Sequence, residues 1–153
     1  MPALDHVNVV TADMDRALAF YAGGLGLTVV MDRVLDGAWF ATLTGCPEAR
    51  ARCVILDAPQ GGCRVELLQF DRAGAGHPGN SLPATPGLRH LALRVDDLDA
   101  ILATLAARCG ITARPVEVPR AIVRGGKRMA YVHDPDGVLV ELCQYGGGQP
   151  DFR

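Results

Sequence analysis

The stretch LRHLALRVDDLDAILATLAARCG, Leu88 to Gly110, repeats the opening run LDHVNVVTADMDRALAFYAGGLG, Leu4 to Gly26, without a gap. In both copies a histidine, His6 or His90, lies in an apolar strand-like segment that leads into a helical pattern. Repetition of this kind indicates two copies of one structural unit. The sequence therefore predicts a duplicated fold, with a histidine on the first strand of each copy.

The last strands of the two units match as well. CRVELLQF, residues 63–70, aligns with VLVELCQY, residues 138–145, which pairs Glu66 with Glu141. The next polar position is also shared, since Gln69 aligns with Gln144. Each unit thus begins with a strand histidine and ends with a strand glutamate.

The periodicity of apolar residues predicts the same order of elements in both units. The first should contain strands at 4–11, 27–35, 52–57 and 63–70, with a helix that Asp13 caps and that ends near Gly23. Residues 36–47 fit a short helix as well as a strand, and we favour the helix. The second unit should contain strands at 88–95, 113–118, 128–133 and 138–145, with a helix at 97–108 and a DPDG turn at 134–137.

Between the units, residues 71–87 are rich in glycine, proline and small polar residues, which is typical of a connector. The predicted fold class is therefore α+β. It consists of two βαβββ modules, residues 4–70 and 88–145, in a chain of 153 residues that can bury a shared core.

Composition excludes several functions. With 49% apolar and 21% charged residues and a net charge of −2, the chain lacks the basic excess that nucleic-acid binding requires. No segment approaches the roughly 20 apolar residues of a membrane span, and the MPALDH start does not resemble a signal peptide, so we expect a cytoplasmic protein. Five cysteines without a C-x-x-C pair predict reduced, mostly buried thiols.

Because of the repeat, two histidines and two glutamates occupy equivalent positions and can be considered together as candidate metal ligands. A lone strand histidine is more often a structural residue than a ligand. Pairing the units about a pseudo-two-fold axis, however, would bring together His6, Glu66, His90 and Glu141. Two imidazoles and two carboxylates suit a divalent ion such as Zn²⁺, Ni²⁺, Co²⁺, Mn²⁺ or Fe²⁺, with positions left open for a substrate.

These motifs, and most specifically YVHDPDGVLVEL at 131–142, resemble the vicinal oxygen chelate superfamily. The superfamily includes glyoxalase I, methylmalonyl-CoA epimerase, extradiol dioxygenases and the bleomycin and fosfomycin resistance proteins. The resemblance implies one domain over residues 1–153, in which the paired modules form a cupped mixed sheet. It also implies that His6, Glu66, His90 and Glu141 are the metal ligands. A glutamate at position 66 is similar to glyoxalase I, whereas dioxygenases use two histidines and one glutamate and are commonly twice as long.

The resemblance predicts a metal-dependent lyase, isomerase or epimerase that removes a proton next to a carbonyl. The substrate would chelate the metal through two neighbouring oxygens, and Glu141 or Glu66 would act as the base. Arg124 and Lys127, in a basic loop, and Tyr131 are candidates for substrate binding, although a merely solvated loop is an equal alternative. We expect a homodimer, with the site either within one chain or between two. The alternatives are a protein that sequesters a drug or metabolite and a small extradiol dioxygenase.

Overall fold

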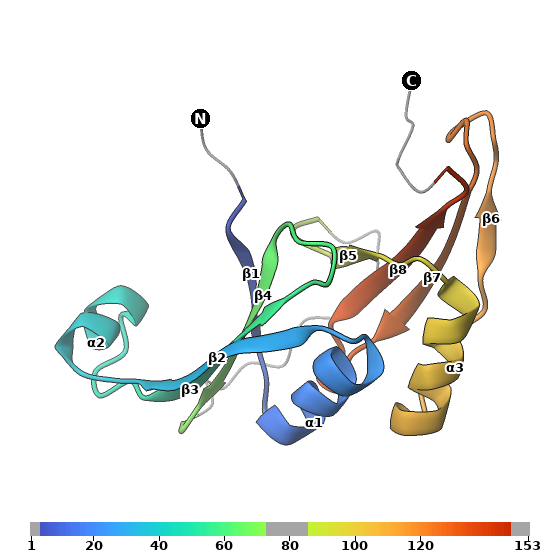
Figure 1. Ribbon diagram of the computed structural model, residues 1–153. Coiled ribbons are helices and arrows are strands. Elements are labelled where there is room, and N and C mark those ends of the chain that lie inside the picture. Colours follow the sequence, from blue (N-terminus) through green and yellow to red (C-terminus); the bar gives the residue numbers. More distant parts are fainter. Residues whose placement is uncertain (1–3, 73–85, 148–153) are drawn as a thin grey trace. The chain divides into compact units, whose positions relative to one another are not determined.

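The computed structural model describes residues 4–72 and 86–147, so most of the expected connector at 71–87 lies outside the described residues. The chain separates into two compact units, Met1–His77 and Pro78–Arg153. Figure 1 shows that each unit is built from a small sheet and helices. No helix of the described ranges is long and apolar enough to span a membrane.

Unit 1 contains one four-stranded mixed sheet. Its strands are in the order β1-β4-β3-β2, with β1 parallel to β4 and the other pairs antiparallel. In chain order the elements are β1 (His6–Val10), α1 (Met14–Leu18), the π-helical turn η1 (Ala19–Gly24), β2 (Thr28–Leu35), α2 (Ala38–Thr44), β3 (Ala51–Asp57) and β4 (Arg64–Phe70). The helix that we favoured at 36–47 is therefore confirmed as α2.

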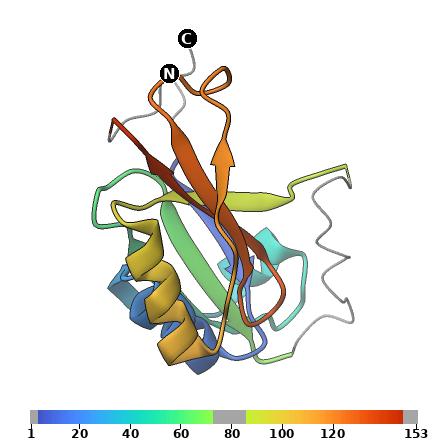
Figure 2. The ribbon, with the colours of Figure 1, turned by 90° about the vertical axis from the view of Figure 1, so that its right-hand side faces the viewer.

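Unit 2 repeats this topology with the order β5-β8-β7-β6 and the same parallel pairing of its first and last strands. Its elements are β5 (His90–Arg94), α3 (Leu98–Cys109), β6 (Val116–Val118), β7 (Lys127–His133) and β8 (Leu139–Tyr145). In Figure 2 α3 lies along one face of this sheet. The predicted α+β class with two β-α-β-β-β units is confirmed.

Two elements differ from the sequence prediction. The strand expected at 113–118 is only three residues long, because Pro115 and Pro119 flank β6 and cannot donate a backbone hydrogen bond. The first helix does not stay α-helical, because its last turn widens into η1, in which the Leu25 N–H donates to the Phe20 carbonyl at 2.9 Å. The expected turn at Asp134 is confirmed, since its Oδ1 accepts from the backbone N–H groups of Asp136 and Val138.

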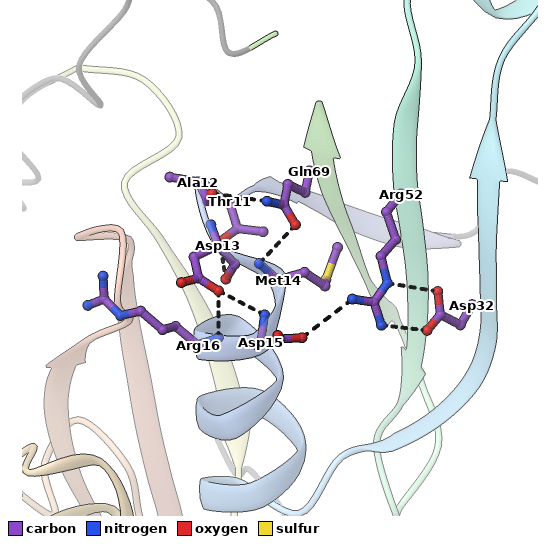
Figure 3. Close-up of polar contacts among 9 residues, drawn as sticks. All are labelled: Thr11, Ala12, Asp13, Met14, Asp15, Arg16, Asp32, Arg52 and Gln69. Carbon is purple, nitrogen blue, oxygen red and sulfur yellow. Dashed lines mark hydrogen bonds and ion pairs between the residues drawn. The ribbon is translucent and has the colours of Figure 1, made fainter. Parts of the chain in front are cut away.

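A glutamine fixes the start of the helix in each unit. In unit 1 the Gln69 side chain accepts from the Met14 N–H at 3.1 Å and donates to the Ala12 carbonyl at 3.1 Å (Figure 3). In unit 2 Gln144 makes the equivalent bonds to Leu98 at 3.2 Å and to Asp96 at 2.8 Å. The last strand of each unit is thereby tied to the loop before its helix, where backbone groups otherwise lack intrahelical partners.

Replacing Gln144 by glutamate is expected to lower the free energy of unfolding by about 1–2 kcal/mol. The carboxylate can still accept from the Leu98 N–H, but it cannot donate to the Asp96 carbonyl. Urea unfolding of Gln144→Glu and Gln69→Glu checks this, and the two losses should be similar because the bonds are equivalent. Wild-type stability in both variants would contradict a stabilising role for the glutamines.

The strands place the candidate ligands on the sheet face opposite the capped helix. Because side chains alternate along a strand, Gln69 points towards α1 and Glu66 towards the other face. On that face of unit 1, Phe40 of α2 packs with a cluster of small and apolar residues: Ala49, Ala51, Cys53 and Leu68. By the same alternation, Gln144 faces α3 and Glu141 lies on the opposite face of unit 2.

Candidate metal centre

In unit 1 the structure brings His6 and Glu66 together across neighbouring strands. The Nε2 atom of His6 lies 3.6 Å from Oε2 of Glu66. On the other side of the ring, Nδ1 lies 2.9 Å from Oδ2 of Asp5. A hydrogen bond from Nδ1 to a carboxylate leaves Nε2 of the neutral imidazole as the lone-pair donor, which is how metal-binding histidines are commonly oriented.

Unit 2 repeats the pair with the same strand register. His90 Nε2 lies 3.4 Å from Glu141 Oε2, and the His90 ring packs edge-on against Tyr131 with 5.5 Å between centroids. Glu141 is opposite Ala92, two residues after His90, as Glu66 is opposite Asn8, two residues after His6. The predicted four site residues therefore form two equivalent pairs, one in each unit.

The spacing within each pair fits two ligands of one ion. Two atoms that each bind an ion at about 2.1 Å, with an angle near 90–110° between them, are about 3.0–3.4 Å apart. The observed separations of 3.6 Å and 3.4 Å are close to that range. Within the described parts of the chain, no three His, Cys, Asp or Glu side chains gather closely enough to hold a metal. Among the described residues, each pair therefore offers two potential ligands of an ion.

The two glutamates have different surroundings. Glu66 receives hydrogen bonds from neutral donors, with Asn8 Nδ2 at 2.9 Å from Oε2 and the Cys53 thiol at 3.5 Å from Oε1. Glu141 instead accepts from an ammonium group, with Lys127 Nζ at 2.6 Å from Oε1. The Glu141 side chain is also the more buried of the two, at 8% exposed against 19% for Glu66.

Lys127 does not lie in a flexible loop, as the sequence suggested, but is the first residue of β7. Burial alone would lower the pKa of Lys127, but the hydrogen bond and negative charge of Glu141 raise it above its ordinary value. The lysine is therefore a cation bound to Glu141. Sequence reasoning missed this pair, although a carboxylate buried in a strand requires a nearby cation and Lys127 begins the adjacent strand.

The other two candidate substrate residues lie near this pair in the chain. Tyr131 is opposite Glu141 in the β7–β8 register and the residue is 39% exposed. Arg124 is exposed in the segment before β7, where the Gly126 carbonyl accepts from the Gly146 N–H at 2.9 Å. Tyr131 thus shares the ligand pair's sheet face, whereas Arg124 lies in the segment that leads into the same strand.

Burial and the charge of Glu66 raise the pKa of the Cys53 thiol to about 12. The folded protein therefore keeps this proton above pH 9, where the unfolded chain releases it. We expect the free energy of unfolding to fall as the pH rises from 9 towards 12, by up to about 1.4 kcal/mol per pH unit from this thiol. Urea titrations of reduced, metal-free wild type and Cys53→Ala check this, because the variant should show the shallower slope. Equal slopes would contradict it.

Comparison with known proteins matches the chain to one protein family. A model described as "Glyoxalase/Bleomycin resistance protein/Dioxygenase superfamily" matches residues 3–142. The chain is 31% identical to a 2-epi-5-epi-valiolone epimerase from Actinomyces sp, over 97% of this chain and 82% of the relative. It is 30% identical to the uncharacterized protein YaeR of Escherichia coli, over 91% and 93% of the respective chains.

The fold is shared with solved structures. A glyoxalase family protein from Bacillus cereus superimposes with a TM-score of 0.78, covering 95% of each chain at 22% identity. Its similarity concerns the fold alone. The family model, in contrast, spans all four residues of the His and Glu pairs.

Proposed function

This chain belongs to the glyoxalase, bleomycin resistance protein and dioxygenase superfamily, and from that membership we propose that it is a metal-dependent lyase, isomerase or epimerase. The observation that carries the proposal is the presence of two equivalent His and Glu pairs, with Nε2 and Oε2 facing each other at 3.6 Å and 3.4 Å. Each pair would supply two ligands, and the two pairs together would complete the coordination of a single ion. The pairs would come from one chain or from two.

The donor set decides which ions fit. Imidazole nitrogen and carboxylate oxygen suit Zn²⁺, Ni²⁺, Co²⁺, Mn²⁺ or Fe²⁺. The ligands would be His6, Glu66, His90 and Glu141. When bound, the ion would supply positive charge next to two neighbouring oxygens of a small substrate and so favour loss of a proton from the adjacent carbon.

The protein side chains would move that proton. A glutamate carboxylate, Glu66 or Glu141, would remove it from the carbon and return it. Return to the opposite face of the same carbon inverts the centre, and return to the neighbouring carbon isomerises the substrate. The relative named as an epimerase supports chemistry of this kind. Tyr131 and Arg124 would contact the substrate, since both are exposed, Tyr131 lies on β7 opposite Glu141, and Arg124 lies in the segment that leads into β7.

We also propose a cytoplasmic homodimer. Unit 1 presents large apolar side chains to solvent on its edge strand β2 and on α2, with Val30 52% exposed, Trp39 57% and Leu43 74%. Exposed apolar residues that gather on neighbouring elements favour association. Sedimentation equilibrium of wild type and Leu43→Glu tests this, because a monomeric wild type would contradict the homodimer.

Deuterium exchange tests the activity. Protein loaded with one divalent ion at a time is incubated in deuterated buffer with 2-hydroxy ketones, 2-oxo compounds and 3-oxo thioesters, and exchange is followed by NMR. We expect exchange next to the carbonyl of one substrate class, lost in chelator-treated protein and restored by the ion. Tight binding of a compound without exchange under any ion would overturn the enzyme proposal in favour of a sequestering protein.

A further inference from the structure

The two units have the same strand register but different neighbours around their glutamates. Lys127 is opposite Tyr145 in the β7–β8 pair, and Ala51 is opposite Phe70 in the β3–β4 pair. Tyr145 and Phe70 are equivalent ends of the repeated last strand. Lys127 therefore takes the place that a methyl side chain takes in unit 1, and the duplication alone does not account for this cation.

Unit 1 supplies a different donor from a different strand. Asn8 on β1 donates to Glu66 Oε2 at 2.9 Å, whereas Ala92 takes that position on β5. Asn8 thus contacts the same oxygen that faces His6. The Asn8 amide is a neutral donor, so its hydrogen bond holds the Glu66 carboxylate less firmly than a charge-assisted hydrogen bond would.

The contact in unit 2 is of another kind. The Lys127 and Glu141 side chains are 13% and 8% exposed, so their charge-assisted hydrogen bond of 2.6 Å is shielded from water. The ammonium also lies 5.5 Å from the centroid of the Tyr145 ring, which holds it in place. Because Lys127 occupies Oε1, only Oε2 of Glu141 remains, and that oxygen faces His90.

We propose that Lys127 is a positioning residue that makes the two glutamates unequal. It fixes Glu141 as a ligand through one oxygen, and it leaves Glu66 as the carboxylate that can release the ion and carry the proton. This inference rests on the proposed function, because it assigns roles within the same metal site.

Titration of Co²⁺ into metal-free protein tests the assignment without any substrate. We expect Glu141→Gln to weaken Co²⁺ binding at least a hundredfold and Glu66→Gln to weaken it less than tenfold. Lys127→Met frees Oε1 of Glu141 and removes a competing cation, so it should tighten Co²⁺ binding about tenfold and lower the melting temperature of the metal-free protein. Lys127→Arg keeps the charge and should restore wild-type affinity.

Arg128→Met is the matched control. Arg128 is the next cation on β7, but it pairs with Asp99 at 2.8 Å and with Glu117 at 3.2 Å, so its loss should leave Co²⁺ affinity unchanged. If Glu141→Gln and Glu66→Gln lost Co²⁺ affinity by factors within threefold of each other, the assignment would be wrong. This comparison holds even if Lys127→Met does not fold. Weakened or unchanged Co²⁺ binding by folded Lys127→Met would also overturn the assignment. If the wild-type protein bound no Co²⁺, the metal site itself would be refuted.

Discussion

Substituting alanine for His90 or for Glu141 is expected to abolish stoichiometric metal binding. Each residue supplies one of the two candidate ligand atoms of unit 2, His90 Nε2 and Glu141 Oε2, which lie 3.4 Å apart. Loss of either would leave unit 2 with a single ligand, and we expect affinity to fall at least a hundredfold, which is about 2.7 kcal/mol or more. Mass spectrometry of untagged protein, reloaded with each ion and then dialysed, measures the remaining metal per chain.

Two controls match these variants in chemistry. His133→Ala removes an exposed histidine from the end of β7, and Glu117→Ala removes an exposed glutamate from β6. Both should retain the wild-type metal content, because neither residue belongs to the His and Glu pairs. Full metal content in His90→Ala and Glu141→Ala, or equal loss in the controls, would show that unit 2 does not supply the ligands.

Glu66→Gln is expected to produce a protein that holds metal but exchanges almost no substrate protons. The glutamine side chain still reaches the position facing His6, but it cannot accept a proton from carbon. Loss of a general base typically lowers rates by about 10²–10⁴, or roughly 3–5 kcal/mol in the barrier. The measurement is the exchange rate of the substrate identified in deuterated buffer, together with metal content on the same sample.

Glu48→Gln serves as the control for this variant, since Glu48 is an exposed glutamate of the same unit between α2 and β3. It should exchange protons at the wild-type rate. If metal-loaded Glu141→Gln exchanged no substrate protons while Glu66→Gln exchanged them at the normal rate, the base would be Glu141.

Most of the fold could be predicted because the repeat allows each unit to be checked against the other. The aspartates before both helices are an example, since Asp13 accepts from the Asp15 and Arg16 N–H groups and Asp97 accepts from that of Ala100. The sequence did not reveal the π-helical end of the first helix. That end depends on which carbonyl the Leu25 N–H reaches, and a pattern of apolar residues does not specify this choice.

The candidate site was predictable to the extent that it follows the repeat. His6 pairs with Glu66 and His90 with Glu141 because equivalent strands have equivalent registers. The partners that distinguish the glutamates, Asn8 and Lys127, were not predicted. Whether a side chain reaches a given carboxylate on the adjacent strand depends on rotamers and on burial, and neither is periodic in the sequence.

The unequal neighbours of the two glutamates bear on why the units are joined in one chain. A symmetric assembly of two copies of an ancestral single unit would have identical groups at both glutamates, because every substitution would appear twice. After gene duplication and fusion, position 51 could remain alanine while its counterpart became Lys127, and Asn8 could differ from Ala92. Fusion therefore allows two inherited copies of one carboxylate to have different neighbours, Asn8 at Glu66 and Lys127 at Glu141.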